Sequence, residues 1–282
     1  MRELDDYLNR VKNLPPAPRV LPELLALLRE ENVDTSRVVA VINYDPGLTA
    51  NVLQLCNSAF FAASTPADDL HEAVTRLGFR QVYQLVTALV GSRTLGPAQK
   101  GYGIDKGELW KHSVASAIAA QAVARHLGTP ESTVYTATLL HDIGKIVLSE
   151  ALEHQYHQLV AETQDRQQSL LESEKALLGF HHAEVGGRLL TRWRLPANLV
   201  DAVTHHHAPL DAGPHARLAA HVYLGNMIAH SMGMGYGCLP FAMRGRDEVL
   251  DLLGISAEEL PRFMIETFEQ LATIETLFRV GS

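Results

Sequence analysis

Apolar residues along the chain recur at intervals of three and four, the spacing of an amphipathic helix. The clearest case is RVLPELLALLREE, residues 19–31, where Leu21, Leu24, Leu25 and Leu28 share one face. No segment of useful length alternates apolar and polar residues, as a half-buried strand requires. The pattern therefore predicts an all-α protein.

Helix boundaries are marked by familiar capping residues in the first hundred positions. Asp34 or Thr35 suits the N-cap of one helix, and Asp45, which precedes a proline, suits the start of another. The segment DLHEAVTRLGFRQVYQLVTALV, residues 69–90, predicts two helices separated near Gly78.

The stretch GPAQKGYG has the composition of a loop and separates two groups of predicted helices. We expect a helical lobe at residues 1–100 and a second at 104–282, the two packed together. Asp105 and Glu108 form a capping-box pattern before a long alanine-rich helix. The second lobe thus begins directly after the loop.

Composition excludes several classes of protein. The 282 residues are 46% apolar and 20% charged, with a net charge of −8 and no basic cluster, so we expect no nucleic-acid partner. No apolar run approaches the roughly 18 residues of a membrane span, and the N-terminus does not read as a signal peptide. The two cysteines, Cys56 and Cys238, form no CxxC motif. We therefore expect free thiols in a cytoplasmic protein.

Histidines carry the chemistry of the second lobe. The chain has 14, many of them between His112 and His230. A helix expected to restart near Glu131 runs through TLLHDIGKI, where His141 and Asp142 stand side by side among apolar residues. Adjacent polar residues in an apolar run are costly unless something satisfies them, and a bound metal would do so.

Metal ligands on several helices can converge in the core of a helical bundle. Neighbouring residues on a helix point about 100° apart, so each histidine run supplies one main ligand. We choose His182 from its pair because the small Gly186 follows one turn later, and we favour His206 from its triplet. The predicted ligands are His112, His141, Asp142, His182 and His206, with His207 and Asn226 as further candidates.

Four imidazoles and one carboxylate suit a transition metal such as Fe, Zn, Mn or Ni better than Mg or Ca. One carboxylate offers little charge to neutralise two dications, so we expect one bound metal rather than two.

The order His112, then His141-Asp142, then Gly144-Lys145 resembles the HD superfamily of metal-dependent phosphohydrolases. The later histidines are similar to its HD-GYP branch, which carries two metals and cleaves cyclic dinucleotides. The first lobe resembles the HDOD family, an HD-related output domain of bacterial signalling proteins. The first-lobe stretches that carry this second resemblance are LPPAPRVLPELLALL, VINYDPGLTANVLQLCNSAFF and AVTRLGFRQVYQLV. In the second lobe, LLTRWRLPANLVDAVTHHHAP also resembles a later motif of that family.

The resemblance implies an all-helical fold whose second lobe is an HD-type bundle. HDOD domains act mainly as signalling modules, most without a full catalytic set, and often accompany receiver-type domains. This chain keeps His141, Asp142 and Lys145 but has Asn226 near the place of the last acidic HD ligand. It also lacks the glycine-tyrosine-proline segment of the cyclic-dinucleotide enzymes.

Two hypotheses follow. The first is a regulatory module that holds a metal and binds a signalling partner. The second is a metal-dependent phosphohydrolase acting on a nucleotide, cyclic dinucleotide or phosphomonoester. In the second, Asp142 and a metal would activate water while Lys145 steadies a phosphoryl oxygen. A third reading combines them, with occupancy of the site shifting the packing of the lobes.

Overall fold

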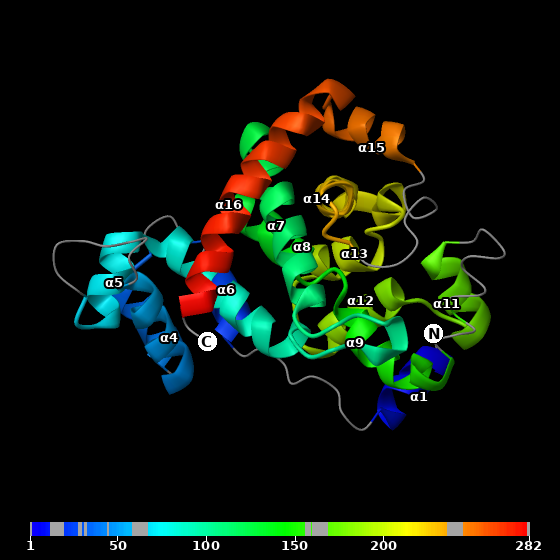
Figure 1. Ribbon diagram of the computed structural model, residues 1–282, viewed down its shortest axis with the longest axis horizontal. Coiled ribbons are helices and arrows are strands. Elements are labelled where there is room, and N and C mark those ends of the chain that lie inside the picture. Colours follow the sequence, from blue (N-terminus) through cyan, green and yellow to red (C-terminus); the bar gives the residue numbers. More distant parts are fainter. Residues whose placement is uncertain are drawn as a thin grey trace.

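The computed structural model describes residues 2–11, 20–27, 30, 33–43, 45–57, 67–155, 159, 169–235 and 245–280. Leu28 and Cys238, which the sequence analysis named, lie outside these ranges. The described residues form helices and turns without a strand, apart from one bridge between Gln99 and Ile104. The expected all-α class is confirmed (Figure 1).

The helices of the first hundred residues are α1 (Arg2–Arg10), α2 (Val20–Leu27), α3 (Thr35–Asn43), α4 (Pro46–Cys56), α5 (Leu70–Leu77) and α6 (Phe79–Leu95). Those that follow are η1 (Lys100–Tyr102), α7 (Glu108–His126), α8 (Glu131–Leu139), α9 (Ile143–Leu152), η2 (Glu153–Gln155), α11 (Leu170–Leu178), α12 (His182–Arg192), α13 (Ala197–Thr204), η3 (Pro209–His215), α14 (Ala216–Ser231), α15 (Arg246–Leu253), η4 (Ala257–Glu259) and α16 (Leu260–Val280).

The helix starts follow their capping residues closely. Asp34 accepts a hydrogen bond from the Ser36 amide, and Asp45 accepts one from the Leu48 amide, each at 2.9 Å. Gly78 separates α5 from α6 with a φ of 76°, a conformation that glycine adopts without penalty. These local signals therefore set the boundaries of α3 to α6.

The start of α7 differs from expectation. Its N-cap is Gly107, in the left-handed region, rather than Asp105. Only half of the capping box forms, since the Glu108 carboxylate accepts from the Asp105 amide at 3.0 Å. Glycine adopts this left-handed conformation without the steric cost that a side chain would bring.

Helix α7 is the centre of the second group of helices. It is buried along most of its length and packs against α8, α14 and α16 (Figure 1). Gly225 of α14 brings the two helices close, because a β-carbon there would lie 2.4 Å from the Ser116 carbonyl oxygen. This close packing fixes the position of His112, which α7 carries.

Contacts also connect the two groups of helices. One apolar cluster includes Leu24 and Ile42 of the first group with Ile143 and Val203 of the second. Arg80 of α6 binds Glu131 of α8 at 2.8 Å. A boundary at residues 100–104 stays a prediction, because this core is continuous across it.

Helix α1 packs against helices much later in the chain. Asp5 accepts two hydrogen bonds of 2.6 Å from Arg188 of α12. The Tyr7 hydroxyl donates to the Val147 carbonyl of α9 at 3.2 Å, and its ring lies 5.1 Å from that of Phe180. Helix α1 thus braces α9 and α12, the two helices beside the histidine cluster (Figure 1).

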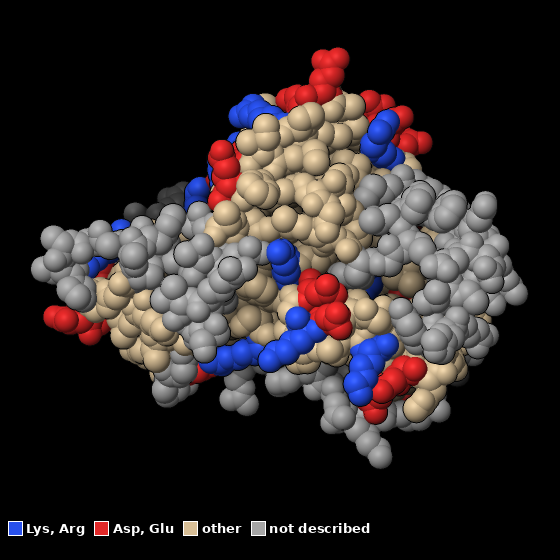
Figure 2. Space-filling view, viewed as in Figure 1, with Lys and Arg blue, Asp and Glu red and all other residues tan. Residues whose placement is uncertain are grey.

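The surface carries both signs of charge. On the face shown in Figure 2, basic and acidic side chains are interspersed rather than gathered into patches of one sign. Among the described residues, no helix is long and apolar enough to cross a bilayer. Cys56 is a buried free thiol.

Candidate metal centre

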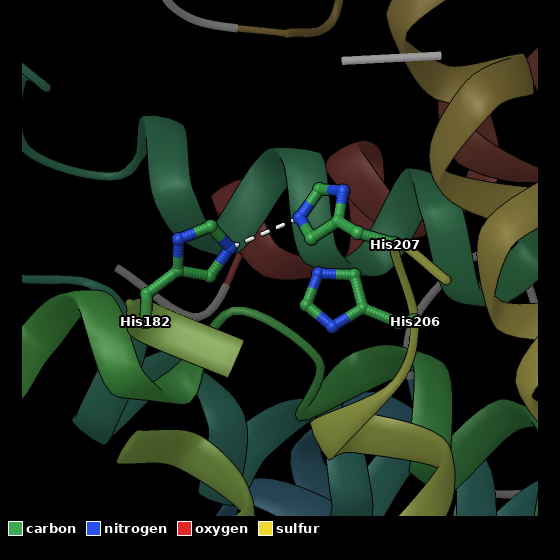
Figure 3. Close-up of side chains that lie close together, drawn as sticks. All are labelled: His182, His206 and His207. Atoms are coloured by element: carbon green, nitrogen blue, oxygen red, sulfur yellow. Dashed lines mark hydrogen bonds between the residues drawn. The ribbon is translucent and has the colours of Figure 1, made fainter. Parts of the chain in front are cut away.

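The five predicted ligands come together, four of them at or beside the ends of helices. His112 lies within α7, and His182 is the first residue of α12. His141 and Asp142 lie in the turn between α8 and α9, and His206 lies just after α13. All five side chains are buried, with at most 1% of any residue exposed. Figure 3 shows His182 and His206 approaching each other from α12 and the end of α13.

The prediction of one helix running through His141 and Asp142 is wrong. Helix α8 ends at Leu139, and Asp142 occupies the N-cap position of α9. The Leu140 amide still bonds to the Thr136 carbonyl, but the His141 amide turns to Thr138 at 3.3 Å. The break places the adjacent histidine and aspartate side by side in a turn, where both reach the same buried point.

The carboxylate of Asp142 is the point on which the imidazoles converge. Its Oδ2 lies 3.7 Å from Nε2 of His112 and 3.3 Å from Nε2 of His141. Its Oδ1 lies 3.3 Å from Nε2 of His182 and 3.9 Å from Nε2 of His206. Four imidazoles therefore present the same nitrogen to one carboxylate.

The opposite nitrogen of each ring is held by an acceptor. Nδ1 of His112 lies 2.8 Å from the Met234 carbonyl, and Nδ1 of His141 lies 2.6 Å from that of Thr138. Nδ1 of His206 lies 2.7 Å from the carbonyl of Val203. A carbonyl can only accept, so each Nδ1 bears a proton, and in the neutral ring Nε2 carries the lone pair. This is the arrangement by which proteins orient histidine ligands toward a metal.

A dication fits this donor set. Nε2 of His141 and Nε2 of His206 are buried without a hydrogen-bond partner among the described residues. Burying a polar atom without a partner costs about 1–3 kcal/mol. Lone pairs facing inward beside a carboxylate would be satisfied together by one transition-metal ion.

Two groups of three could each hold an ion. One consists of His112, His141 and Asp142, and the other of His182, His206 and His207, with ligand atoms within 4.8 Å of one another in each group. Nε2 of His207 lies 3.1 Å from Nε2 of His182 (Figure 3). His207 thus joins the cluster from the same turn as His206.

Lys145 pairs with the central carboxylate. Its Nζ lies 2.8 Å from Oδ2 of Asp142, and the lysine is 4% exposed. Burial would raise the pKa of Asp142, but His141 and Lys145 outweigh it and hold that pKa well below its usual value. The carboxylate is therefore ionised, as a metal ligand must be.

Asn226, the remaining candidate, and His181 complete the residues considered as ligands. Asn226 on α14 has a buried Oδ1 without a hydrogen-bond partner among the described residues. His181, the residue not chosen from its pair, is the N-cap of α12 and forms a capping box with Glu184. His181 thus has a local role, whereas His182 faces the Asp142 carboxylate.

Two residues beside the cluster escaped the sequence analysis. His230, one turn after Asn226 on α14, packs its ring against His112 with centroids 4.7 Å apart. Glu174 of α11 binds the ring of His182, with its Oε2 2.8 Å from Nδ1. The spacing of His230 from Asn226 was a usable signal. Glu174 had none, because it stands in the charged segment ESEK, which is typical of a solvated helix face.

Fold and cluster together define an HD-type helical domain, in which a histidine-aspartate pair and later histidines meet in a bundle. The HDOD domain profile matches residues 14–209, and the chain belongs to the HDOD domain family.

Curated relatives are longer than this chain. An uncharacterised protein of Treponema pallidum is 26% identical over 201 residues, which cover 71% of this chain and 38% of the relative. A ribonuclease Y of Acholeplasma laidlawii is 26% identical over 148 residues, covering 52% of this chain and 22% of the enzyme. The chain thus spans well under half the length of either protein.

Solved structures share the fold. An HDOD domain protein of unknown function from Geobacter sulfurreducens is 23% identical, with a TM-score of 0.70, over 99% of this chain and 95% of its own. A candidate phosphohydrolase from Shewanella amazonensis is 27% identical, with a TM-score of 0.68, over 94% of this chain and 97% of its own. A protein from Marinobacter aquaeolei assigned to signal transduction has a TM-score of 0.78 at 23% identity, covering 100% of this chain and 65% of its own.

The buried histidines predict a pH-dependent stability. Burial, and next the proximity of His141, lowers the pKa of His112 and His206 well below 6.5. Below about pH 6.5 the unfolded chain therefore binds protons that the folded chain excludes. As the pH falls below about 6.5, we therefore expect the free energy of unfolding of the metal-free protein to decrease. The decrease is up to about 1.4 kcal/mol for each unit of pH and each histidine.

Urea titrations of chelator-treated protein at pH 7.5, 6.5 and 5.5 would measure this slope. Asp142 does not add to the slope in this range. The stability that comes from its low pKa is lost only when the pH falls to about 3.9, the pKa of aspartate in the unfolded chain. Replacing His206 with glutamine should reduce the slope. A free energy of unfolding that stays constant from pH 7.5 to 5.5 would contradict the assignment of neutral buried histidines.

Proposed function

We propose that this chain is a regulatory HDOD module that holds one transition-metal ion as part of its structure. The ligands would be His112, His141, Asp142, His182 and His206, with His207 beside them. The observation that carries the proposal is the convergence of four Nε2 atoms on the Asp142 carboxylate. Family membership supports the regulatory role, since HDOD domains act mainly as signalling modules and most lack a full catalytic set.

Burial favours a structural metal over a catalytic one. Catalytic metal sites keep a coordination position open to water or substrate, whereas structural sites are closed. None of the five ligands is more than 1% exposed. Asn226, near the place of an acidic HD ligand, adds no negative charge, and Lys145 is engaged by Asp142. One carboxylate supports one ion better than two.

The module would transmit its signal to a protein partner or to a receiver-type domain fused to it. The Treponema pallidum relative has more than half its length outside the matched region, which provides space for such a domain in a longer protein. Occupancy of the site could alter the packing between the two groups of helices, because the ligands belong to helices that share one core with the first group.

Metal analysis of the purified chain tests the proposal. We expect about one equivalent of transition metal per chain after reconstitution with Fe, Zn, Mn or Ni. Less than about a tenth of an equivalent with all four would overturn it. Incubation with phosphomonoesters, nucleotides and cyclic dinucleotides should give no hydrolysis beyond that of His141→Ala.

A phosphohydrolase is the second candidate function. Lys145 and Asp142, 2.8 Å apart, are the pair that could steady a phosphoryl oxygen beside a metal-activated water. The Shewanella amazonensis protein, 27% identical, is itself a candidate phosphohydrolase. Turnover by the wild-type chain that both His141→Ala and Lys145→Met abolish would favour this function over the regulatory one.

A further inference from the structure

Glu174 is a carboxylate without any exposed surface, on a helix that is otherwise half-buried or exposed at most positions. Helix α11 starts with a capping box between Ser169 and Glu172, and its buried side chains are Ser173 and Glu174. Burying an isolated carboxylate is very costly, so its surroundings must supply hydrogen bonds and compensating charge.

Three donors from two other segments meet this carboxylate. The His182 amide donates to Oε2 at 2.7 Å, and the His182 ring lies with Nδ1 2.8 Å from the same oxygen. The Tyr102 hydroxyl of η1 donates to Oε1 at 2.8 Å. Glu174 thus joins α11, the start of α12 and the segment between the two groups of helices.

The bond to the ring fixes which nitrogen of His182 carries the proton. Both oxygens of Glu174 accept hydrogen bonds, Oε2 from the His182 amide and Oε1 from the Tyr102 hydroxyl, so the carboxylate is the acceptor toward the ring. Nδ1 of His182 is then the protonated nitrogen. In the neutral ring this leaves the lone pair on Nε2, 3.3 Å from Oδ1 of Asp142 and 3.1 Å from Nε2 of His207.

The 3.1 Å separation of the two Nε2 atoms is suited to metal ligation. Ligands about 2.0–2.1 Å from a tetrahedral zinc ion lie roughly 3.3 Å apart. His182 is the ligand held by a charged group, whereas His112, His141 and His206 bond to backbone carbonyls. A carboxylate acceptor raises the basicity of the imidazole more than a carbonyl does.

We propose that Glu174 is a positioning residue that holds His182 in its metal-binding tautomer and strengthens metal binding at the cluster. This proposal rests on the proposed function, since it requires a metal to bind. Loss of such an outer carboxylate typically weakens metal affinity by about 10–100-fold.

Glu174→Gln tests it, because the amide keeps the shape and removes the charge. The matched control is Glu172→Gln on the same helix. Glu172 is exposed, and glutamine can replace glutamate in a capping box. Zn²⁺ affinity would be measured by competition with a chromophoric chelator. We expect about 10–100-fold weaker binding for Glu174→Gln and no change for Glu172→Gln.

Nitrogen-15 NMR of the histidine rings supplies a readout that needs no metal. In the metal-free wild type we expect His182 to be protonated at Nδ1, and in Glu174→Gln we expect a mixture of tautomers. A wild type that binds no Zn²⁺ would refute both the proposed function and the role of Glu174 in metal binding. If that protein still showed the Nδ1 tautomer, the hydrogen bond between Glu174 and the His182 ring would remain supported. An unaltered tautomer and unaltered affinity in Glu174→Gln would overturn the role of Glu174 alone.

A folding defect can be separated from the positioning effect. Circular dichroism would establish that each variant keeps its helical content. Should Glu174→Gln fail to fold, Glu174→Asp withdraws the carboxylate from His182 while retaining its charge, and the same change of tautomer and loss of Zn²⁺ affinity is expected. Wild-type affinity and tautomer in a folded Glu174→Asp would then count against the proposal.

Discussion

Replacing His141 with alanine is expected to abolish stoichiometric transition-metal binding, weakening affinity by more than about 100-fold. His141 stands at the centre of the cluster, with Nε2 3.3 Å from Asp142 and Nδ1 held by the Thr138 carbonyl. Removing an outer carboxylate alone costs about 10–100-fold, so removing a ligand should cost more. The substitution also leaves Asp142 without one of the neighbours that keep it ionised.

The loss should also appear in thermal unfolding. A metal that binds only the folded chain stabilises it by about 2.7 kcal/mol when its free concentration is 100 times the dissociation constant. Wild-type protein should therefore melt at a higher temperature with Zn²⁺ than with chelator, and His141→Ala should melt at the same temperature in both. His71→Ala is the matched control, since His71 is exposed and far along the chain from the cluster. A Zn²⁺-dependent increase retained in His141→Ala would show that the ion binds elsewhere.

Sequence patterns predicted the helices best where local chemistry sets their ends. Asp45 caps α4 and Gly78 divides α5 from α6, as the capping residues indicated. The break between α8 and α9 was missed because TLLHDIGKI contains no glycine or proline at the point of turning. Tertiary contacts produce that break: the side chains of His141 and Asp142 both turn toward the cluster, which a continuous helix would prevent.

The clustering of the candidate ligands was predictable for a different reason. Histidine and aspartate in apolar surroundings are costly, and that cost is visible in the sequence at His141 and Asp142. Glu174 has no such signal, because burial of a glutamate among charged neighbours depends on how α11 docks. Outer residues of a site are set by packing between helices, which spacing along one helix does not reveal.

The packing that builds the site depends on Gly144, which the sequence analysis noted only as part of a motif. A β-carbon at this position would lie 1.9 Å from the His182 carbonyl oxygen and 2.7 Å from the Gly186 amide nitrogen. The backbones of α9 and α12 are therefore in direct contact. This contact brings Asp142, just before α9, next to His182 at the start of α12.

We expect Gly144→Ala to lower the free energy of unfolding by about 3 kcal/mol, at the upper end of the usual cost of overpacking. For a protein of this size the melting temperature should fall by about 6–12 °C. The atoms in the way are backbone, so the helices must separate rather than a side chain rotate. Zn²⁺ affinity should fall as well, because separation moves Asp142 away from His182.

Gly91→Ala in α6 is the matched control, since it adds the same methyl group to another buried helical glycine. Its β-carbon would lie 3.3 Å from a methyl group of the Leu139 side chain, which can shift. Alanine is also favoured over glycine within a helix by about 1 kcal/mol, so the net change should be small. Thermal melts and Zn²⁺ titrations of both variants would decide the matter. Equal stability of the two would mean that α9 and α12 do not depend on backbone contact. A destabilised Gly144→Ala with wild-type Zn²⁺ affinity would mean that this contact supports the fold without positioning the ligands.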